Sequence, residues 1–166
     1  MTSFFTSDLH FDHDAIRIHC NRPWDTKEAM NEAIIQNWNE IVGPKDEVFI
    51  VGDFAWKRHA HFLGALKGKK HLIKGNHDRM PQVALRCFTS VTQILERKFG
   101  EHVVVMCHFP MLTWNRKHYG AWHLHGHCHG DNHHGRHYYR PGVLDVGVDA
   151  NNFTPIPWEM IERKLE

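Results

Sequence analysis

The chain has 166 residues, which is enough for a single domain, residues 1–166, with its own hydrophobic core. A net charge of +1, with 42% hydrophobic and 23% charged residues, gives no electrostatic reason to expect a dedicated binder of nucleic acids or membrane surfaces. The sequence has no apolar run of membrane-spanning length and no pattern of a signal peptide, so we expect a cytoplasmic protein. The four cysteines lack CxxC spacing, which favours reduced thiols.

The N-terminal part predicts one short strand and one long helix. Residues 2–6 are apolar and β-prone, and residues 26–42 carry the clearest helical pattern. Asp25 with Glu28 three residues later resembles a capping box, and Gly43 ends the helix. The side chains expected on the buried face of this helix are Met30, Ile34, Trp38 and Ile41.

Strand-like and helix-like segments then alternate along the chain. We expect strands at residues 47–51, 71–74, 121–125 and 142–148, two strands within residues 88–107, and helices at residues 57–66 and 157–164. This alternation indicates an α/β architecture.

Five of the apolar runs end in small or polar residues followed by side chains that commonly bind metals. In α/β sheets, ligands bind beyond the carboxyl ends of the strands, so each strand would deliver its side chain to the same rim. Glycines at several of these points leave room where the backbone must turn. The five segments are Asp8-Leu9-His10, Gly52-Asp53, Gly75-Asn76-His77-Asp78, Cys107-His108 and Gly126-His127-Cys128-His129.

The residue types at these points suit a pair of transition-metal ions. Carboxylates, an amide oxygen and imidazoles form a mixed nitrogen and oxygen set, which favours Mn, Fe, Zn, Ni or Co over Mg or Ca. The groups are too many for one tetrahedral ion, and they suit two ions that share a carboxylate. The candidate ligands are Asp8, His10, Asp53, Asn76, His108, His127 and His129.

The order DxH, GD, GNHD, H and GHxH resembles the fingerprint of the calcineurin-like metallophosphoesterase superfamily. Here the blocks read SDLHFDH, VGDFAW, KGNHDR, CHFP and GHCHG, and the tail LDVGVDANNFTP resembles the closing strand and loop of small bacterial and phage members. The resemblance implies a metal-dependent phosphoric ester hydrolase. Its fold would be two packed β-sheets flanked by helices, in the order α/β/β/α, without a cap domain.

The resemblance also implies two metal sites that share Asp53, with Mn as the first expectation. One site would add Asp8, His10 and His129, and the other would add Asn76, His108 and His127. A hydroxide that bridges the two ions would attack phosphorus directly, without a phospho-enzyme intermediate.

Two further residues of the GNHD block receive catalytic roles from the resemblance. His77 would contact the phosphate, either protonating the leaving oxygen or only orienting the phosphate. Asp78 would accept a hydrogen bond from His77 and fix its tautomer. One stretch departs from the family pattern, because Gly52-Asp53 is followed by Phe54-Ala55-Trp56-Lys57-Arg58. We expect its last three residues to line the entrance instead.

Four side chains are candidate substrate contacts, and plainer interpretations stand beside them. His13 could equally be exposed or cap a helix. Trp114 belongs to residues 110–122, which are rich in aromatic and basic side chains. That segment is either a specificity element that stacks a base and holds a phosphate or simply an exposed basic loop. The four candidates are His13, Arg58, Arg79 and Trp114.

Other histidines support weaker interpretations. His123 and His125 alternate with apolar residues, so they are expected to be either packed or exposed on one face of a strand. A polar cluster invites a second metal site, but we favour a solvated loop because no apolar strand end presents it. That cluster comprises Asp131, His133, His134 and His137.

The leading functional prediction is hydrolysis of a phosphodiester or phosphomonoester, with a small phosphoester or nucleotide as substrate and no membrane partner. The alternative is a nuclease, or a nucleotide phosphodiesterase or phosphatase, that acts on nucleic-acid ends. A remote alternative is a non-catalytic metal-binding scaffold, which predicts a damaged ligand set that this sequence does not have. A structural zinc protein would instead show a closed Cys/His set.

Overall fold

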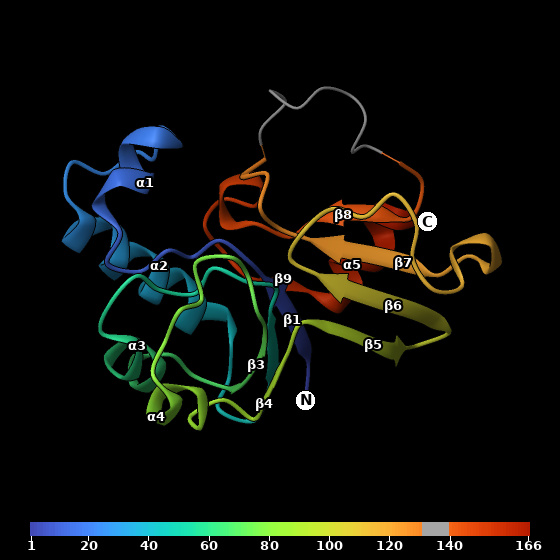
Figure 1. The fold of residues 1–166 in the computed structure, drawn as a ribbon, viewed down its shortest axis with the longest axis horizontal. Coiled ribbons are helices and arrows are strands. Elements are labelled where there is room, and N and C mark those ends of the chain that lie inside the picture. Colours follow the sequence, from blue (N-terminus) through green and yellow to red (C-terminus); the bar gives the residue numbers. More distant parts are fainter. Residues whose placement is uncertain (131–139) are drawn as a thin grey trace.

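The computed structural model describes residues 1–130 and 140–166, and two β-sheets pack face to face in it (Figure 1). The first sheet consists of β4 (Ser90–Thr92), β3 (Lys69–Ile73), β2 (Glu47–Ile50), β1 (Ser3–Thr6) and β9 (Ile156–Pro157), in that order. The second consists of β5 (Ile94–Phe99), β6 (His102–Cys107), β7 (Trp122–His125) and β8 (Val143–Asp145). Strands β1 to β4 are mutually parallel, as are β6 to β8, whereas β9 and β5 run antiparallel to their neighbours.

Helices cover the outer face of the first sheet and one flank of the space between the sheets (Figure 1). Helices α2 and α3 contribute buried side chains to the core on the outer face of the first sheet, and α5 contacts β9, β1 and β8. The helices are α1 (Asp14–His19), α2 (Lys27–Ile41), α3 (His59–Ala65), α4 (Gln82–Leu85) and α5 (Trp158–Leu165), with short 3-10 turns η1 (Lys117–Tyr119) and η3 (Val148–Ala150).

Alternation along the central strands explains the layers. In β1, Phe4 joins the core under the helices, whereas the next residue, Phe5, joins the core between the sheets. In β6, Val104 faces the first sheet and Val105 faces outward, where Trp114 covers it. Neighbouring side chains of a strand point to opposite faces, so these apolar strands supply two cores at once. Two packed sheets flanked by helices are what the resemblance implied, and the predicted fold class is confirmed.

The predicted helix at residues 26–42 is confirmed as α2, with two differences. Its cap is Thr26 rather than Asp25, because the Thr26 hydroxyl accepts a hydrogen bond from the Ala29 amide. Ile41 is 41% exposed, although it follows Trp38 at helical spacing. It is the last helical residue, and the chain turns away there, so Val42 is buried in its place.

Two regions differ from the sequence prediction. Residues 88–107 form three strands rather than two, because β4 pairs with β3 in the first sheet before the chain crosses to β5 in the second. The short helices α1 and α4 were not predicted, since segments of six and four residues carry too little periodicity to identify.

Three remaining expectations can be settled or set aside. No helix of the described residues is long and apolar enough to cross a membrane. None of the four cysteines, all of which lie in the described residues, forms a disulfide. The proposed solvated cluster of Asp131, His133, His134 and His137 lies outside the described residues.

Candidate metal centre

The carboxyl ends of parallel strands from both sheets meet at one edge, and the seven predicted ligands lie there. Asp8 and His10 follow β1, Asp53 follows β2, and Asn76 follows β3 in the first sheet. In the second sheet, His108 follows β6, and the other two follow β7; these are His127 and His129. The meeting of the two sheets therefore converts a scattered sequence pattern into one cluster.

The cluster has Asp53 at its centre. Its Oδ2 lies 3.5 Å from His10 Nε2 and 3.4 Å from His108 Nε2. Asn76 Oδ1 lies 3.0 Å from the same His108 nitrogen. His129 Nε2 lies 3.8 Å from Asp8 Oδ1. Two overlapping sets of donor atoms fall within 4.8 Å of one another and could each hold a metal ion: Asp8 with His10 and His129, and Asp8 with Asp53 and His108.

Five of the seven candidate ligands have a backbone in the left-handed region, which non-glycine residues rarely adopt. Such conformations persist only where the surrounding structure imposes them, and they concentrate at functional sites. The residues are Asp8 (φ 56°), His10 (φ 50°), Asp53 (φ 56°), His127 (φ 70°) and His129 (φ 51°). The backbone strain therefore coincides with the predicted ligands.

Two imidazoles are placed as a cation would require. His10 Nε2 is buried and finds no hydrogen-bond partner among the described residues. His108 Nδ1 lies 2.9 Å from the Val51 carbonyl oxygen, so its Nε2 faces the oxygens of Asn76 and Asp53. A neutral His108 that donates to Val51 would point a lone pair at two acceptors, an arrangement that a bound cation relieves. The donor set therefore fits divalent metal ions.

The electrostatics of the cluster point the same way. Burial lowers the pKa of His10 to about 2, which keeps its imidazole neutral. Burial also raises the pKa of Asp8 to about 6, against the opposing effect of His129 and His108. Burial disfavours a charged His129, but hydrogen bonding to Asp149 and the charge of Asp8 outweigh it and raise its pKa to about 10.

An ion pair between Arg22 and Asp149, which the sequence analysis did not predict, holds the candidate ligand His129 in place. The Asp149 carboxylate lies 2.8 Å from His129 Nδ1, and it accepts two hydrogen bonds of 2.8 Å from Arg22. Arg22 also donates to the carbonyl oxygens of Asp8 and Leu9. Arg22 and Asp149 lie 127 positions apart in sequence, so no local spacing could have indicated their pairing.

The predicted role of Asp78 is wrong. Its carboxylate is buried and accepts hydrogen bonds from the backbone amides of Asp53, Phe54 and Gly75, at 2.8 to 2.9 Å. Both oxygens thus accept hydrogen bonds from the loops that carry Asp53 and Asn76, and among the described residues no hydrogen bond joins them to the His77 ring. Asp78 holds two ligand-bearing loops together.

Of the predicted substrate contacts, His13 and Arg79 lie beside the cluster. His13 Nδ1 is 3.3 Å from His10 Nδ1, and its ring stacks on Trp56. His77 places its ring centroid 5.4 Å from that of His10. A cavity next to the cluster is lined by Trp56, Asn76, His77 and Arg79.

Arg58 and Trp114 do not fit the roles predicted for them. The Arg58 guanidinium forms an ion pair with Asp12, to which it donates two hydrogen bonds of 2.9 Å. Trp114 is buried, and its indole N–H donates to the Ala121 carbonyl. It covers the outer face of the second sheet, so its ring is not free to stack on a base.

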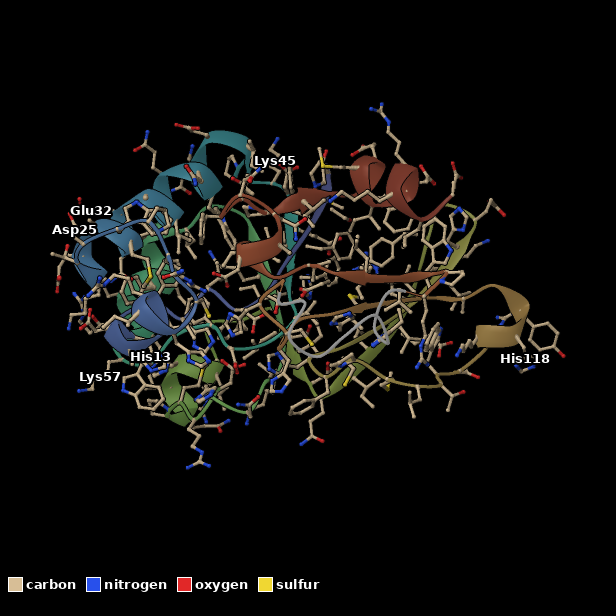
Figure 2. All side chains as sticks on the ribbon, turned by 90° about the horizontal axis from the view of Figure 1, so that it is seen from above. His13, Asp25, Glu32, Lys45, Lys57 and His118 are labelled. Carbon is tan, nitrogen blue, oxygen red and sulfur yellow. The ribbon has the colours of Figure 1, made fainter. Side chains whose placement is uncertain are left out.

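Within the segment at residues 110–122, the part from Arg116 to Tyr119 lies away from the cluster. Arg116 and Tyr119 share a cavity with His102, which begins β6, whereas His108 follows the end of that strand about 20 Å away. Figure 2 shows His118 at the opposite end of the molecule from His13. Trp114, Arg116 and Tyr119 therefore do not form a specificity element beside the cluster. His123 and His125, in the following strand, are buried and packed.

No family model matches the chain. An uncharacterized protein of Methanocaldococcus jannaschii is 28% identical, with 98% of this chain and 90% of that protein aligned. A protein of unknown function from Aquifex aeolicus, AQ665, superposes with a TM-score of 0.81 at 22% identity over 98% of both chains, so the two share a fold. YfcE, a phosphoesterase from E. coli, aligns with 89% of this chain and 78% of its own at 14% identity, with a TM-score of 0.44. That superposition is too loose to carry a reaction from one chain to the other.

We predict that Gly126→Ala lowers the free energy of unfolding by about 1–3 kcal/mol. A methyl group there would overlap Ser7 Oγ and Asp8 Oδ2, so the carboxylate must move. The control is Gly64→Ala in α3, where a methyl group meets nothing within 4 Å. This substitution is expected to raise the free energy of unfolding by about 0.5–1 kcal/mol. Urea unfolding measures both, and a Gly126→Ala protein as stable as the wild type would contradict the close packing described.

We predict that Arg22→Met lowers the free energy of unfolding by about 3–5 kcal/mol, because it removes the guanidinium that pairs with the buried carboxylate of Asp149. Adding Asp149→Asn to this variant should recover part of the loss, since the neutral amide needs no guanidinium beside it. Lys98→Met, which removes the exposed ion pair with Glu101, should change stability little. If the double variant were less stable than the single one, the pair would not be the source of the effect.

Proposed function

We propose that this chain is a calcineurin-like metallophosphoesterase, which holds two divalent metal ions and hydrolyses phosphodiesters or phosphomonoesters. The observation that carries the proposal is the convergence of all seven predicted ligands at one edge, around the buried carboxylate of Asp53. The motif order alone favoured this function. The strained backbone at five of these residues and the unpartnered nitrogen of His10 support it independently.

The two proposed sites share Asp53, whose Oδ2 lies 3.5 Å from His10 Nε2 and 3.4 Å from His108 Nε2. Asp8, His10 and His129 lie on one side, where the His10 and His129 rings stack at 5.2 Å between centroids. The other side comprises Asn76, His108 and His127, in which the His108 and His127 rings meet edge to face at 5.2 Å. When bound, two divalent ions would lower the pKa of a water molecule and neutralise charge on the phosphate.

The chain's own residues prepare this centre in three ways. Asp149 holds Nδ1 of His129, which leaves Nε2 directed at the cluster. The Val51 carbonyl does the same for His108. The His77 amide donates to Asp53 Oδ1 at 2.9 Å, so Asp53 Oδ2 remains for the shared position. These three candidate ligands are thereby oriented by the protein itself.

We assign His77 to the phosphate rather than to a metal. Its ring stands between the His10 ring and Trp56, at the border of the cluster and the cavity. A leaving oxygen that extends into the cavity would pass this imidazole, which could donate a proton or a hydrogen bond to it. Manganese is the metal that we propose first, since a mixed nitrogen and oxygen set suits Mn, Fe, Zn, Ni or Co.

We expect the purified protein with Mn²⁺ to hydrolyse p-nitrophenyl phosphate or bis-p-nitrophenyl phosphate, and a chelator to abolish the activity. Asp53→Asn should lose both bound Mn²⁺, measured by elemental analysis, and activity, because it removes the charge shared by the two sites. The control is Glu101→Gln, an exposed carboxylate in the turn between β5 and β6. Hydrolysis that survives complete removal of metal would contradict the proposal.

We expect His77→Ala to retain its metal and lose most of its turnover. For a leaving group of high pKa, kcat should fall by about 10²-fold or more, because general-acid help matters most there. For p-nitrophenyl esters the loss should be smaller, since that leaving group departs without a proton. His118→Ala, at the far end of the molecule, is the control (Figure 2). Equal losses for both leaving groups would limit His77 to orienting the phosphate.

A further inference from the structure

A cavity of about 510 Å³ adjoins the metal centre, and its walls include Trp56, Asn76, His77 and Arg79. This volume falls within the range of small-molecule sites, about 300–1,000 Å³. Asn76 and His77 belong to the proposed catalytic group. A molecule that has its phosphate at the metal centre can therefore reach into the cavity with the rest of its structure.

Trp56 stands out among the tryptophans because it is 47% exposed, whereas Trp38, Trp114 and Trp122 are at most 8% exposed. An exposed indole that borders a cavity gains nothing from core packing, so its position calls for a partner. The ring is nevertheless held in place. The His13 ring stacks on it at 4.5 Å between centroids, with an interplanar angle of 9°. The backbone amide of Trp56 donates a hydrogen bond to the Phe11 carbonyl at 2.8 Å.

The aromatic surface is continuous with the metal centre. His13 Nδ1 lies 3.3 Å from His10 Nδ1, and the His77 ring lies 5.7 Å from Trp56 at an angle of 49°. Trp56 thus has one face covered by an imidazole, and the rest of the ring is available on the cavity side. A flat ligand that stacks there would need no rearrangement of the protein.

Arg79 gives the same cavity a positive charge. Among the described residues no carboxylate pairs with its guanidinium, in contrast to Arg58, which Asp12 neutralises. An unpaired guanidinium beside a phosphoesterase centre suits a phosphate oxygen. The cavity therefore offers stacking at Trp56 and anion binding at Arg79.

We propose that this cavity binds the nucleobase of a nucleotide substrate, with the base on Trp56 and the phosphate reached by Arg79. This inference rests on the proposed function and narrows its substrate to phosphoesters of nucleosides. Stacking of a base on an aromatic side chain tolerates any base, so the site selects the class rather than one nucleotide. Simple sugar phosphates and alkyl phosphates would forgo the contact with Trp56.

The test compares two ligands that differ only in the base: the hydrolysis-resistant methylene phosphonate analogues of adenosine 5′-monophosphate and of ribose 5-phosphate. Binding is measured by calorimetry with and without Mn²⁺. The wild type should bind the adenosine analogue about tenfold or more tightly, and Trp56→Ala should abolish this preference while leaving the ribose analogue unchanged. Trp56→Phe should retain most of the preference. Arg79→Gln should weaken both ligands alike.

Tyr119→Ala is the matched control, because Tyr119 is 77% exposed and lies away from the metal centre. Equal affinity of the two analogues, or a preference that survives Trp56→Ala, would overturn the base-binding site. Failure to bind either analogue would overturn it as well. Because binding is measured apart from turnover, this result is distinct from failure of the proposed function, which would appear as absent metal-dependent hydrolysis.

Discussion

The carboxylate of Asp8 is the point at which the two sheets are tied together, and the rest of the centre depends on it. It is fully buried at the end of β1, and it accepts hydrogen bonds from the His127 amide beyond β7. The backbone of the same residue donates to Gly52 and accepts from Arg22. Asp8 thus joins the strand ends of both sheets, and the bond between His108 Nδ1 and the Val51 carbonyl joins them at a second point. Gly126 allows this approach, because any side chain there would occupy the space of the carboxylate.

This arrangement has a cost in backbone conformation and buried charge. Left-handed backbone at five candidate ligands costs of order 1–3 kcal/mol each. Burial also raises the pKa of Asp8 to about 6. The three amides that bond to Asp78, and the pair of Arg22 with Asp149, hold the loops in these unfavourable conformations. The stability of the surrounding sheets therefore offsets the cost of holding the candidate ligands in this arrangement.

The sequence predicted the fold class and the cluster well, because both follow from strands that end at one edge. Asp8, Asp53 and His108 could be placed together without knowing any distance, since parallel strands align their carboxyl ends. The sequence did not predict that the chain crosses from the first sheet to the second after β4. A strand of three residues is too short to indicate which sheet it joins. Asp149 was missed for a related reason: it acts through Arg22 and His129, which are distant in sequence.

The same difference explains why Trp114 does not have the role predicted for it, whereas Trp56, which was expected to line the entrance, borders the cavity. Trp114 stands in a basic, aromatic segment, the composition typical of a nucleic-acid contact, yet it is packed against Val105 and Ala121. Trp56 follows the Gly52-Asp53 motif where the sequence departs from its family pattern, and it borders the cavity. The composition of a segment indicates which contacts its side chains can make. The position of the segment in the fold decides which of these contacts it does make. Residues close in sequence to a metal ligand also lie close to the metal site in space. Residues next to a ligand that depart from the family pattern are therefore the first candidates for substrate specificity.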